Sequence, residues 1–283
     1  MGGGTVPPVP GLASVVTSIL LLPGFLHTAS GPAGGQIYTG TFPGTVRPGF
    51  VYLPPHFSST KRYPVVYFLH GLPAGPYAYT GNKWLAASLA SVGKPAILVE
   101  PQGARDGDDD PEYLDWGKGR DWETYLTHEL VSYIDAHFRT IPTRRGRAIV
   151  GLSAGGYGAV ILGVHNLDRF GAIESWSGYF HPTDPTGTVA LNRGPDADAH
   201  VQIKVLAADV KSRSTFLGFY VGANDTRFHD ENVQFDEELT AAHVPHRFAV
   251  YPGSHSPALW QAHAQVWLAM ALSHLAPATS TVP

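Results

Sequence analysis

The stretch RAIVGLSAGGYG, residues 147–158, is the most informative part of the chain. An apolar run leads into Gly-x-Ser-x-Gly around Ser153, and small residues with helical spacing follow. A serine on a sharp strand-to-helix turn needs small neighbours, and Gly151 and Gly155 supply that space. The first amides of the following helix would face the space above Ser153, where negative charge develops during acyl transfer. The stretch therefore predicts a parallel-sheet enzyme with Ser153 as its nucleophile.

A nucleophilic serine requires a base, and the base requires an acid that orients it. Downstream, the apolar stretch 216–221 leads to Asp225, and the stretch 248–251 leads through a Pro-Gly turn to His255. Both residues follow expected strand ends, where sheet enzymes of this class carry their sites. They also follow the chain order serine, acid, histidine. The sequence predicts Asp225 as the acid and His255 as the base.

Other acids and histidines near these positions remain alternatives. They occupy a polar stretch that leads into a helix, expected helices, or a strand start. Solvated, capping or packing roles are common at such places. The alternatives are Asp230, Glu231 and Asp236 for the acid, and His229, His243, His246 and His263 for the base.

A second turn predicts the oxyanion hole. The apolar stretch 65–69 ends in His70-Gly71-Leu72, a strand exit that contains glycine. In hydrolases of this type, a backbone N–H after an earlier strand joins the N–H that follows the nucleophile. These donors would be Leu72 and Ala154, and one such donor contributes roughly 3–4 kcal/mol to the transition state. A plain β-turn at this glycine is the alternative interpretation.

Composition excludes several classes of protein. The 283 residues include 32 Gly and 24 Pro, about a fifth of the chain against roughly 12% in average proteins. A hydrophobic share of 43% with a net charge of −4 excludes intrinsic disorder. Acidic residues outnumber basic ones, 23 to 19, which argues against nucleic-acid binding. The chain has no cysteine, so disulfides and thiolate metal sites are impossible.

Two parts of the sequence bear on metal binding. The histidines do not form the His-Glu-x-x-His pattern of zinc peptidases, so we expect no catalytic metal and no cofactor. The acidic stretch 106–112 resembles the start of a calcium loop. However, Pro111 stands where that loop needs glycine, and a solvated loop is favoured.

Short apolar runs alternate with amphipathic stretches over most of the chain. This pattern is typical of an α/β fold with a mostly parallel sheet. The expected helices include 122–138, where apolar residues recur with a period of 3.6. The predicted strands are 49–53, 65–69, 96–100, 148–151, 172–176, 215–221 and 246–251, and the predicted helices are 84–92, 122–138, 155–165, 234–242 and 258–275.

The N-terminal segment has two interpretations. Residues 12–26 form an apolar run followed by small and polar residues, as in a secretory signal, but no Lys or Arg precedes it. A first strand or a surface arm is the alternative. We expect an N-terminal arm or signal remnant at 1–35, one catalytic domain at 36–277 and a tail at 278–283. Pro23 interrupts the run, which is too short to span a membrane. Secretion or attachment to the cell envelope is predicted, with a cytoplasmic location as the alternative.

The ordered motifs resemble the "Putative esterase" family of α/β-hydrolases, which includes esterase D-type enzymes, feruloyl and acetyl-xylan esterases and mycobacterial mycolyltransferases. The resemblance covers residues 36–275. The motifs that carry it are VYLPP (51–55), YPVVYFLHG (63–71), GLSAGGYGA (151–159), SG (177–178), GAND (222–225) and PGSH (252–255).

This resemblance implies an α/β-hydrolase fold and the same triad of Ser153, Asp225 and His255, with Leu72 and Ala154 as oxyanion donors. It also implies a carboxylic-ester substrate, either a small molecule or an ester linked to a polysaccharide. Trp260 follows the histidine as a tryptophan often does in the family. Aromatic residues near the expected strand ends, Trp116 and Trp176 among them, are candidates for binding an acyl group, with core packing as the alternative. Trp260 is a further candidate for substrate binding.

Two other functions remain open. Acyl transfer of the mycolyltransferase type is the first, although Gly155-Gly156 after the serine is closer to the hydrolytic esterases. A non-catalytic hydrolase-fold protein that binds glycan or protein is the second, and the complete set of triad residues argues against it. The sequence does not indicate an oligomeric state.

Overall fold

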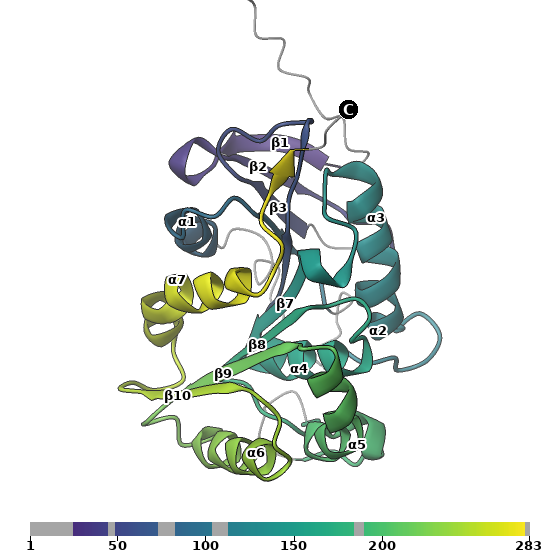
Figure 1. The fold of residues 1–283 in the computed structure, drawn as a ribbon, viewed down its shortest axis with the longest axis vertical. Helices are drawn as coiled ribbons and strands as arrows, with labels where there is room; N and C mark the ends of the chain where they lie inside the picture. Colours follow the sequence, from purple (N-terminus) through teal and green to yellow (C-terminus); the bar gives the residue numbers. More distant parts are fainter. Residues whose placement is uncertain (1–24, 45–48, 73–82, 104–112, 184–189, 281–283) are drawn as a thin grey trace, which may run out of the picture.

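Helices cover both faces of one large sheet in the computed structural model, which describes residues 25–44, 49–72, 83–103, 113–183 and 190–280 (Figure 1). The sheet has nine strands in the order β1-β2-β3-β6-β5-β7-β8-β9-β10. The strands from β6 to β10 pair in parallel, whereas β1, β2 and β3 add an antiparallel edge. The predicted α/β class and mostly parallel sheet are therefore confirmed.

The central strands are short and buried on both faces, as their near-continuous apolar sequences predict. The short strands β4 and β11 form a separate antiparallel pair. This pair connects the segment just before β5 to the C-terminal segment. The strands are β1 (Phe25–Ser30), β2 (Gln36–Gly40), β3 (Gly49–Leu53), β4 (Lys61–Arg62), β5 (Val65–Leu69), β6 (Ile97–Glu100), β7 (Arg147–Leu152), β8 (Ala172–Trp176), β9 (Phe216–Gly222), β10 (Arg247–Tyr251) and β11 (Thr279–Ser280).

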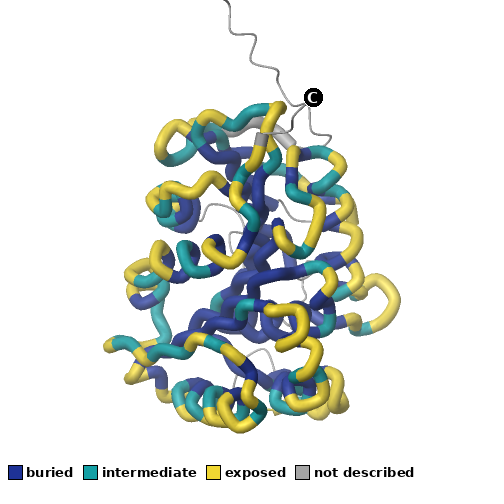
Figure 2. The backbone as a smooth tube through the Cα atoms, in the orientation of Figure 1, coloured by how far each residue is buried: buried dark blue, intermediate teal, exposed yellow. Residues whose placement is uncertain are grey.

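The helices divide between the two faces of the sheet. The first face carries α1 (Lys83–Ser91) and α7 (Pro257–Ser273), and the second carries α3 (Leu130–His137), α4 (Ala154–His165), α5 (Ala199–Ser212) and α6 (His229–Ala241). Each face has its own apolar core. The burial trace in Figure 2 shows buried strands through the middle and exposed outer helix surfaces. Helix α4 is buried nearly all round because its small residues let it lie directly on β7 and β8.

The predicted helix at 122–138 contains a change of helix type. It begins with α2 (Trp122–Thr124), continues through one π-helical turn at Tyr125–Glu129 and ends as α3. Thr127, inside that turn, is fully buried, and its hydroxyl donates to the Glu123 carbonyl at 2.8 Å. The apolar side chains of all three parts still pack in the core on the face of the sheet that carries α3 to α6.

Two strands of the nine-stranded sheet, β1 and β2, one α-helix, α5, and the short strands β4 and β11 were not predicted. Helix α5 is amphipathic, with one buried face. Asp198 caps its N-terminus by accepting from the N–H groups of His200 and Val201 at 2.9 and 3.3 Å. This N-cap followed by Ile203 and Val210 at a spacing of seven residues could have revealed the helix.

Strands lie beyond both predicted domain boundaries. Strand β1 lies inside the segment 1–35 predicted as an arm and pairs with β2, and β11 lies inside the predicted tail and pairs with β4. The rest of the apolar run 12–26 lies outside the described residues. Among the residues that are described, no helix combines the length and apolar character needed to cross a membrane.

Candidate active site

The predicted site residues meet at one edge of the sheet. Parallel strands β5, β7, β8, β9 and β10 all end there, so the segments that follow them lie close together. Ser153 follows β7, Asp225 follows β9 and His255 follows β10. The sheet hydrogen bonding continues to the nucleophile candidate, whose N–H donates to the Trp176 carbonyl at 3.0 Å.

Ser153 occupies a strained backbone conformation between β7 and α4. Its φ of 53° and ψ of −124° lie in a region that residues with a Cβ rarely adopt. The two flanking glycines are required by close backbone approach. A Cβ on Gly151 would lie 2.0 Å from the Gly155 carbonyl oxygen, and one on Gly155 would lie 2.1 Å from the Leu69 carbonyl oxygen. The expected sharp turn is therefore present, with β5, β7 and α4 in direct backbone contact.

A chain of two hydrogen bonds joins the three predicted triad residues. His255 Nε2 lies 2.9 Å from Ser153 Oγ, and His255 Nδ1 lies 2.7 Å from Asp225 Oδ2. The carboxylate accepts, so Nδ1 carries a proton and Nε2 is left to accept from the serine hydroxyl. Asp225 is 1% exposed and Ser153 8% exposed, which shields the chain of hydrogen bonds from water.

The pKa of the Asp225 carboxyl is lowered. Burial alone, the largest single influence, would raise this pKa. The hydrogen bond and charge of His255, with the N–H groups of Arg227 and Phe228, outweigh burial and lower it. Asp225 is therefore a carboxylate at neutral pH and can orient and stabilise a histidine cation.

Two aromatic rings hold the His255 imidazole from its sides. Trp260, in the first turn of α7, meets it edge to face with ring centroids 5.1 Å apart, and Phe228 meets it at 5.2 Å. The N–H of Phe228 also donates to Asp225 Oδ1 at 3.3 Å. Phe228 was not predicted. Its position three residues after the acid, at the start of a helix, is the signal that could have found it.

The predicted oxyanion donors flank the nucleophile. Ala154 is buried at the start of α4, directly after Ser153. Gly71 lies so close that a Cβ added to it would be 3.1 Å from Ser153 Cβ, which brings the neighbouring Leu72 to the site. Their role as donors stays a prediction.

Buried His70 supports the loop that carries Leu72. Its Nε2 accepts from the Gly103 N–H at 3.0 Å, so its proton is on Nδ1, which donates to the Gly71 carbonyl at 3.0 Å. The Tyr113 hydroxyl donates to the His70 carbonyl. Burial lowers the pKa of His70 to about 4, so the ring is neutral at pH 7.

The tryptophans predicted to bind substrate lie in different surroundings. Trp176 is 0% exposed and packs between Phe68 and Tyr220 in the core under α7, so a substrate-binding role for it is not supported. Trp116 is half-buried in a turn, with the Arg193 guanidinium 4.1 Å from its ring centroid. Substrate binding by Trp116 and Trp260 stays a prediction. The acidic stretch 106–112 lies outside the described residues.

The alternative acids and histidines are engaged elsewhere. His246 pairs with Asp236 at 2.8 Å and His229 with Asp230 at 2.9 Å. His263 stacks on Tyr251 with ring centroids 3.6 Å apart. His243 lies just beyond the end of α6 rather than in a helix, and Glu231 belongs to a separate cluster of histidines and acids.

Comparisons with known proteins agree with this geometry. The family model described as "Putative esterase" matches residues 41–266. An esterase of Mycobacterium tuberculosis (strain H37Rv) is 33% identical over an alignment of 235 residues, and the match covers 72% of this chain and 51% of that protein. The chain thus spans about half the length of the curated relatives it matches first.

The chain is also similar to an acyltransferase sequence and to a solved esterase structure. A diacylglycerol acyltransferase/mycolyltransferase of Mycobacterium leprae is 39% identical over 66 residues, 23% of this chain and 19% of that protein. The solved structure of a ferulic acid esterase superposes with a TM-score of 0.66 at 25% identity, covering 89% of this chain and 97% of that one. This structural similarity identifies the α/β-hydrolase fold predicted from the sequence.

Proposed function

Because the chain belongs to the "Putative esterase" family, we propose that it is a serine carboxylic-ester hydrolase that forms an acyl-enzyme on Ser153. The observation that carries the proposal is the hydrogen-bonded series from Ser153 Oγ through His255 to Asp225, with distances of 2.9 and 2.7 Å. The strained turn at Ser153 supports the assignment, since such strain is typical of functional positions.

The proposed reaction assigns a residue to each step. His255 Nε2 takes the hydroxyl proton while Ser153 Oγ attacks the ester carbonyl carbon, and the N–H groups of Leu72 and Ala154 stabilise the oxyanion. The intermediate collapses, the C–O bond to the alcohol breaks, and His255 returns the proton to the leaving alcohol. Water then attacks the acyl-enzyme with His255 as base, which releases the acid and restores Ser153.

A Ser153→Ala variant tests the proposal. We expect it to hydrolyse p-nitrophenyl butyrate roughly 10⁴-fold more slowly than wild type, because the acyl-enzyme cannot form. Asp225→Asn should lower kcat by about 10³- to 10⁴-fold with less change in KM, because the orientation and charge of His255 are lost. An initial burst of p-nitrophenol from wild type would report the acyl-enzyme.

Ser177→Ala is the matched control. Ser177 also follows a buried strand and also has a positive φ, 51°, but it follows β8. We expect this variant to retain activity and fluorophosphonate labelling, and Ser153→Ala to lose both. Equal hydrolysis by Ser153→Ala and wild type would exclude the proposal. A folded wild type that neither hydrolyses esters nor reacts with fluorophosphonate would favour the non-catalytic binding protein.

Acyl transfer is the second candidate, and the matched segment of the mycolyltransferase favours it. The two functions differ only in the acceptor that attacks the acyl-enzyme. Wild type would be given p-nitrophenyl butyrate with increasing glycerol, and the free acid and the glycerol ester would be quantified. We expect mostly free acid. A dominant glycerol ester at low glycerol concentration would favour a transferase.

The proposed substrates are small-molecule esters or esters linked to a polysaccharide. For the location, we propose secretion or attachment to the cell envelope, supported by the apolar run at residues 12–26. Fractionation of cells that express the full sequence tests this, and enzyme found only in the cytoplasmic fraction would contradict it.

A further inference from the structure

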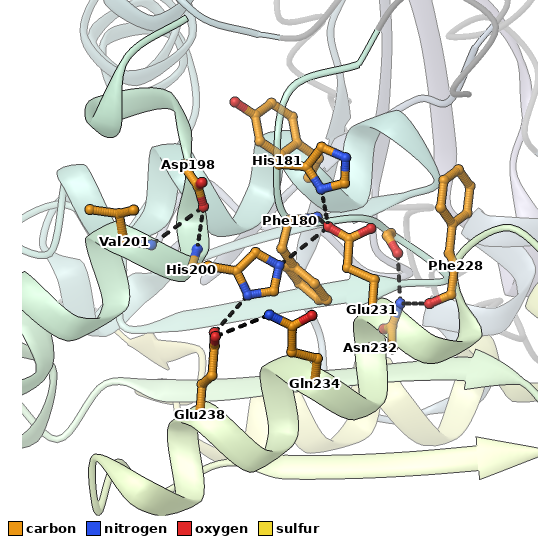
Figure 3. A network of polar contacts seen from close by, with 12 residues as sticks. Phe180, His181, Asp198, His200, Val201, Phe228, Glu231, Asn232, Gln234 and Glu238 are labelled. Atoms are coloured by element: carbon orange, nitrogen blue, oxygen red, sulfur yellow. Dashed lines mark hydrogen bonds and ion pairs between the residues drawn. The ribbon is translucent and has the colours of Figure 1, made fainter. Parts of the chain in front are cut away.

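Two histidines and a glutamate from three separate segments meet on the α5–α6 side of the molecule (Figure 3). His181 follows β8, His200 lies in the first turn of α5 and Glu231 lies in the first turn of α6. One ring nitrogen of each histidine and one oxygen of Glu231 all lie within 4.8 Å of one another. From this cluster we propose a zinc site formed by His181, His200 and Glu231.

The ligand types and spacing suit a transition metal. Imidazole nitrogens with one carboxylate favour zinc over calcium or magnesium. His200 Nε2 lies 3.4 Å from Glu231 Oε1, close to the ~3.3 Å between neighbouring ligands around a tetrahedral zinc. His181 Nδ1 lies 2.6 Å from the same oxygen, so it would move outward as zinc replaces the hydrogen bond. Its side chain is 34% exposed, which leaves room for that movement.

The groups that hydrogen-bond the proposed ligands are arranged as they commonly are around a bound metal. His200 Nδ1 lies 2.6 Å from Glu238 Oε2, which fixes the ring with Nε2 facing Glu231. Histidines that bind metal usually donate their other ring N–H to a carboxylate in this way. The Glu238 carboxylate in turn accepts from Lys204 and Gln234 at 3.2 Å each. The Phe180 N–H donates to Glu231 Oε1 at 2.7 Å and holds that ligand in place.

Solvent can supply the fourth ligand. His181 lines a surface cavity of about 600 Å³ together with Asp198 and the segment around Arg193. A water molecule from this side would complete a tetrahedral site, whereas His200 and Glu231 face the interior with side chains only 13% and 14% exposed.

The position of the cluster indicates a supporting role rather than a catalytic one. Helix α6 starts four residues after Asp225, and its Asn232 donates to the Gly178 carbonyl at 2.8 Å. Zinc at Glu231 would therefore fasten α6 to α5 and to the segment after β8. That attachment would stabilise the loop that carries Asp225.

Direct metal binding tests the proposal. Chelator-treated protein would be titrated with ZnCl₂ by calorimetry at fixed pH, and the visible spectrum would be recorded with Co²⁺ in place of zinc. We expect saturable 1:1 zinc binding and the cobalt bands of tetrahedral coordination. Zinc at 100-fold excess over Kd should raise Tm by about 5 °C.

Variants locate the site and separate binding from folding. His181→Gln should fold, because His181 is at the surface, and should weaken zinc binding at least tenfold. Glu238→Gln should weaken it by about 10- to 100-fold, since Glu238 acts through His200. His165→Gln is the matched control, because His165 pairs with Glu123 at 3.0 Å at similar burial but outside the cluster, and it should bind zinc like wild type.

Two results would overturn the proposal, namely no saturable binding by wild type or equal zinc affinity in wild type and His181→Gln. Ser153→Ala should bind zinc like wild type, so failure of the zinc site and failure of the esterase proposal are distinguishable.

Discussion

At the scale of single residues, neighbouring strand ends hold the residues in and around the candidate site in contrasting states. Ser153 is strained in its backbone, Asp225 is kept as a carboxylate by hydrogen bonds from three neighbouring residues, and His70 is kept neutral. Burial acts on both Asp225 and His70, but only Asp225 has enough partners to overcome it. The surroundings therefore set the charge of each group, rather than its residue type.

His70 gives a prediction for stability against pH. Its pKa is about 4 in the folded protein and 6.5 unfolded, so the unfolded chain binds more protons between these values. Its contribution is complete above pH 6.5 and is lost as pH falls toward 4, about 3 kcal/mol in all. His70→Gln should be less stable than wild type at pH 7. Between pH 7 and 5 the difference should shrink by about 2 kcal/mol, measured by urea unfolding. Parallel stability curves for the two proteins would contradict this.

The sequence allowed residues to be placed where their local context fixes the position. Ser153, Asp225 and His255 each follow a recognisable strand and turn, so their meeting at one sheet edge could be anticipated. Trp176 could not be placed this way. It is the last residue of β8, and alternation along the strand points its side chain into the core with Glu174, whose Oε2 accepts from the indole N–H at 3.1 Å.

At the scale of elements, the turn from β7 into α4 depends on glycines that meet backbone rather than side chains. A Cβ on Gly155 would lie 2.1 Å from the Leu69 carbonyl oxygen and 2.5 Å from that of His70, atoms that cannot move without displacing β5. A Cβ on Gly163, in the same helix, would instead meet the side-chain end of Ile173 at 2.6 Å. We therefore expect replacement by alanine to affect protein stability differently at the two glycines.

Gly155→Ala should destabilise the protein by about 3 kcal/mol and abolish ester hydrolysis, because β5 and α4 must separate under Ser153. Gly163→Ala should cost about 1 kcal/mol or less, since Ile173 can adjust and alanine favours the helix. Urea unfolding of both variants and wild type measures the difference. Equal destabilisation by the two substitutions would refute the backbone argument.

The zinc cluster is an element-level feature that sequence patterns could not reveal. His181, His200 and Glu231 come from a loop and two helices, and successive members are 19 and 31 positions apart in the sequence. No short motif relates them, and α5 itself was not predicted. Their proximity depends on how α5 and α6 pack, which becomes visible only in the folded chain.

At the scale of the whole molecule, the sheet begins earlier than composition suggested. Residues 25–30 pair with β2, and the Tyr52 hydroxyl donates to the Pro32 carbonyl at 3.1 Å. Gly35 also packs directly on the Tyr52 ring. The polar and small residues at 27–35 made this connection hard to predict, because they resemble the end of a secretion signal.

Truncation tests where the folded domain starts. A chain that begins at Phe25 should keep the Tm of the full sequence, because every described strand remains. A chain that begins at Gln36 loses β1 and exposes the unpaired edge of β2, so we expect a Tm lower by at least about 5 °C and aggregation in size-exclusion chromatography. Identical Tm values for the two truncated chains would place the boundary at residue 36, as the sequence predicted.

The π-helical turn at Tyr125–Glu129 has a consequence for the evolution of this chain. Such a turn accommodates one extra residue in a helix, while the regular hydrogen bonds on either side persist. A one-residue insertion or deletion can therefore be inherited here without breaking the helix. Helix α3 would still face the core on its side of the sheet. In an alignment of homologous chains, a one-residue gap inside this helix would then mark a real insertion or deletion. The residues on both sides of the gap would remain equivalent.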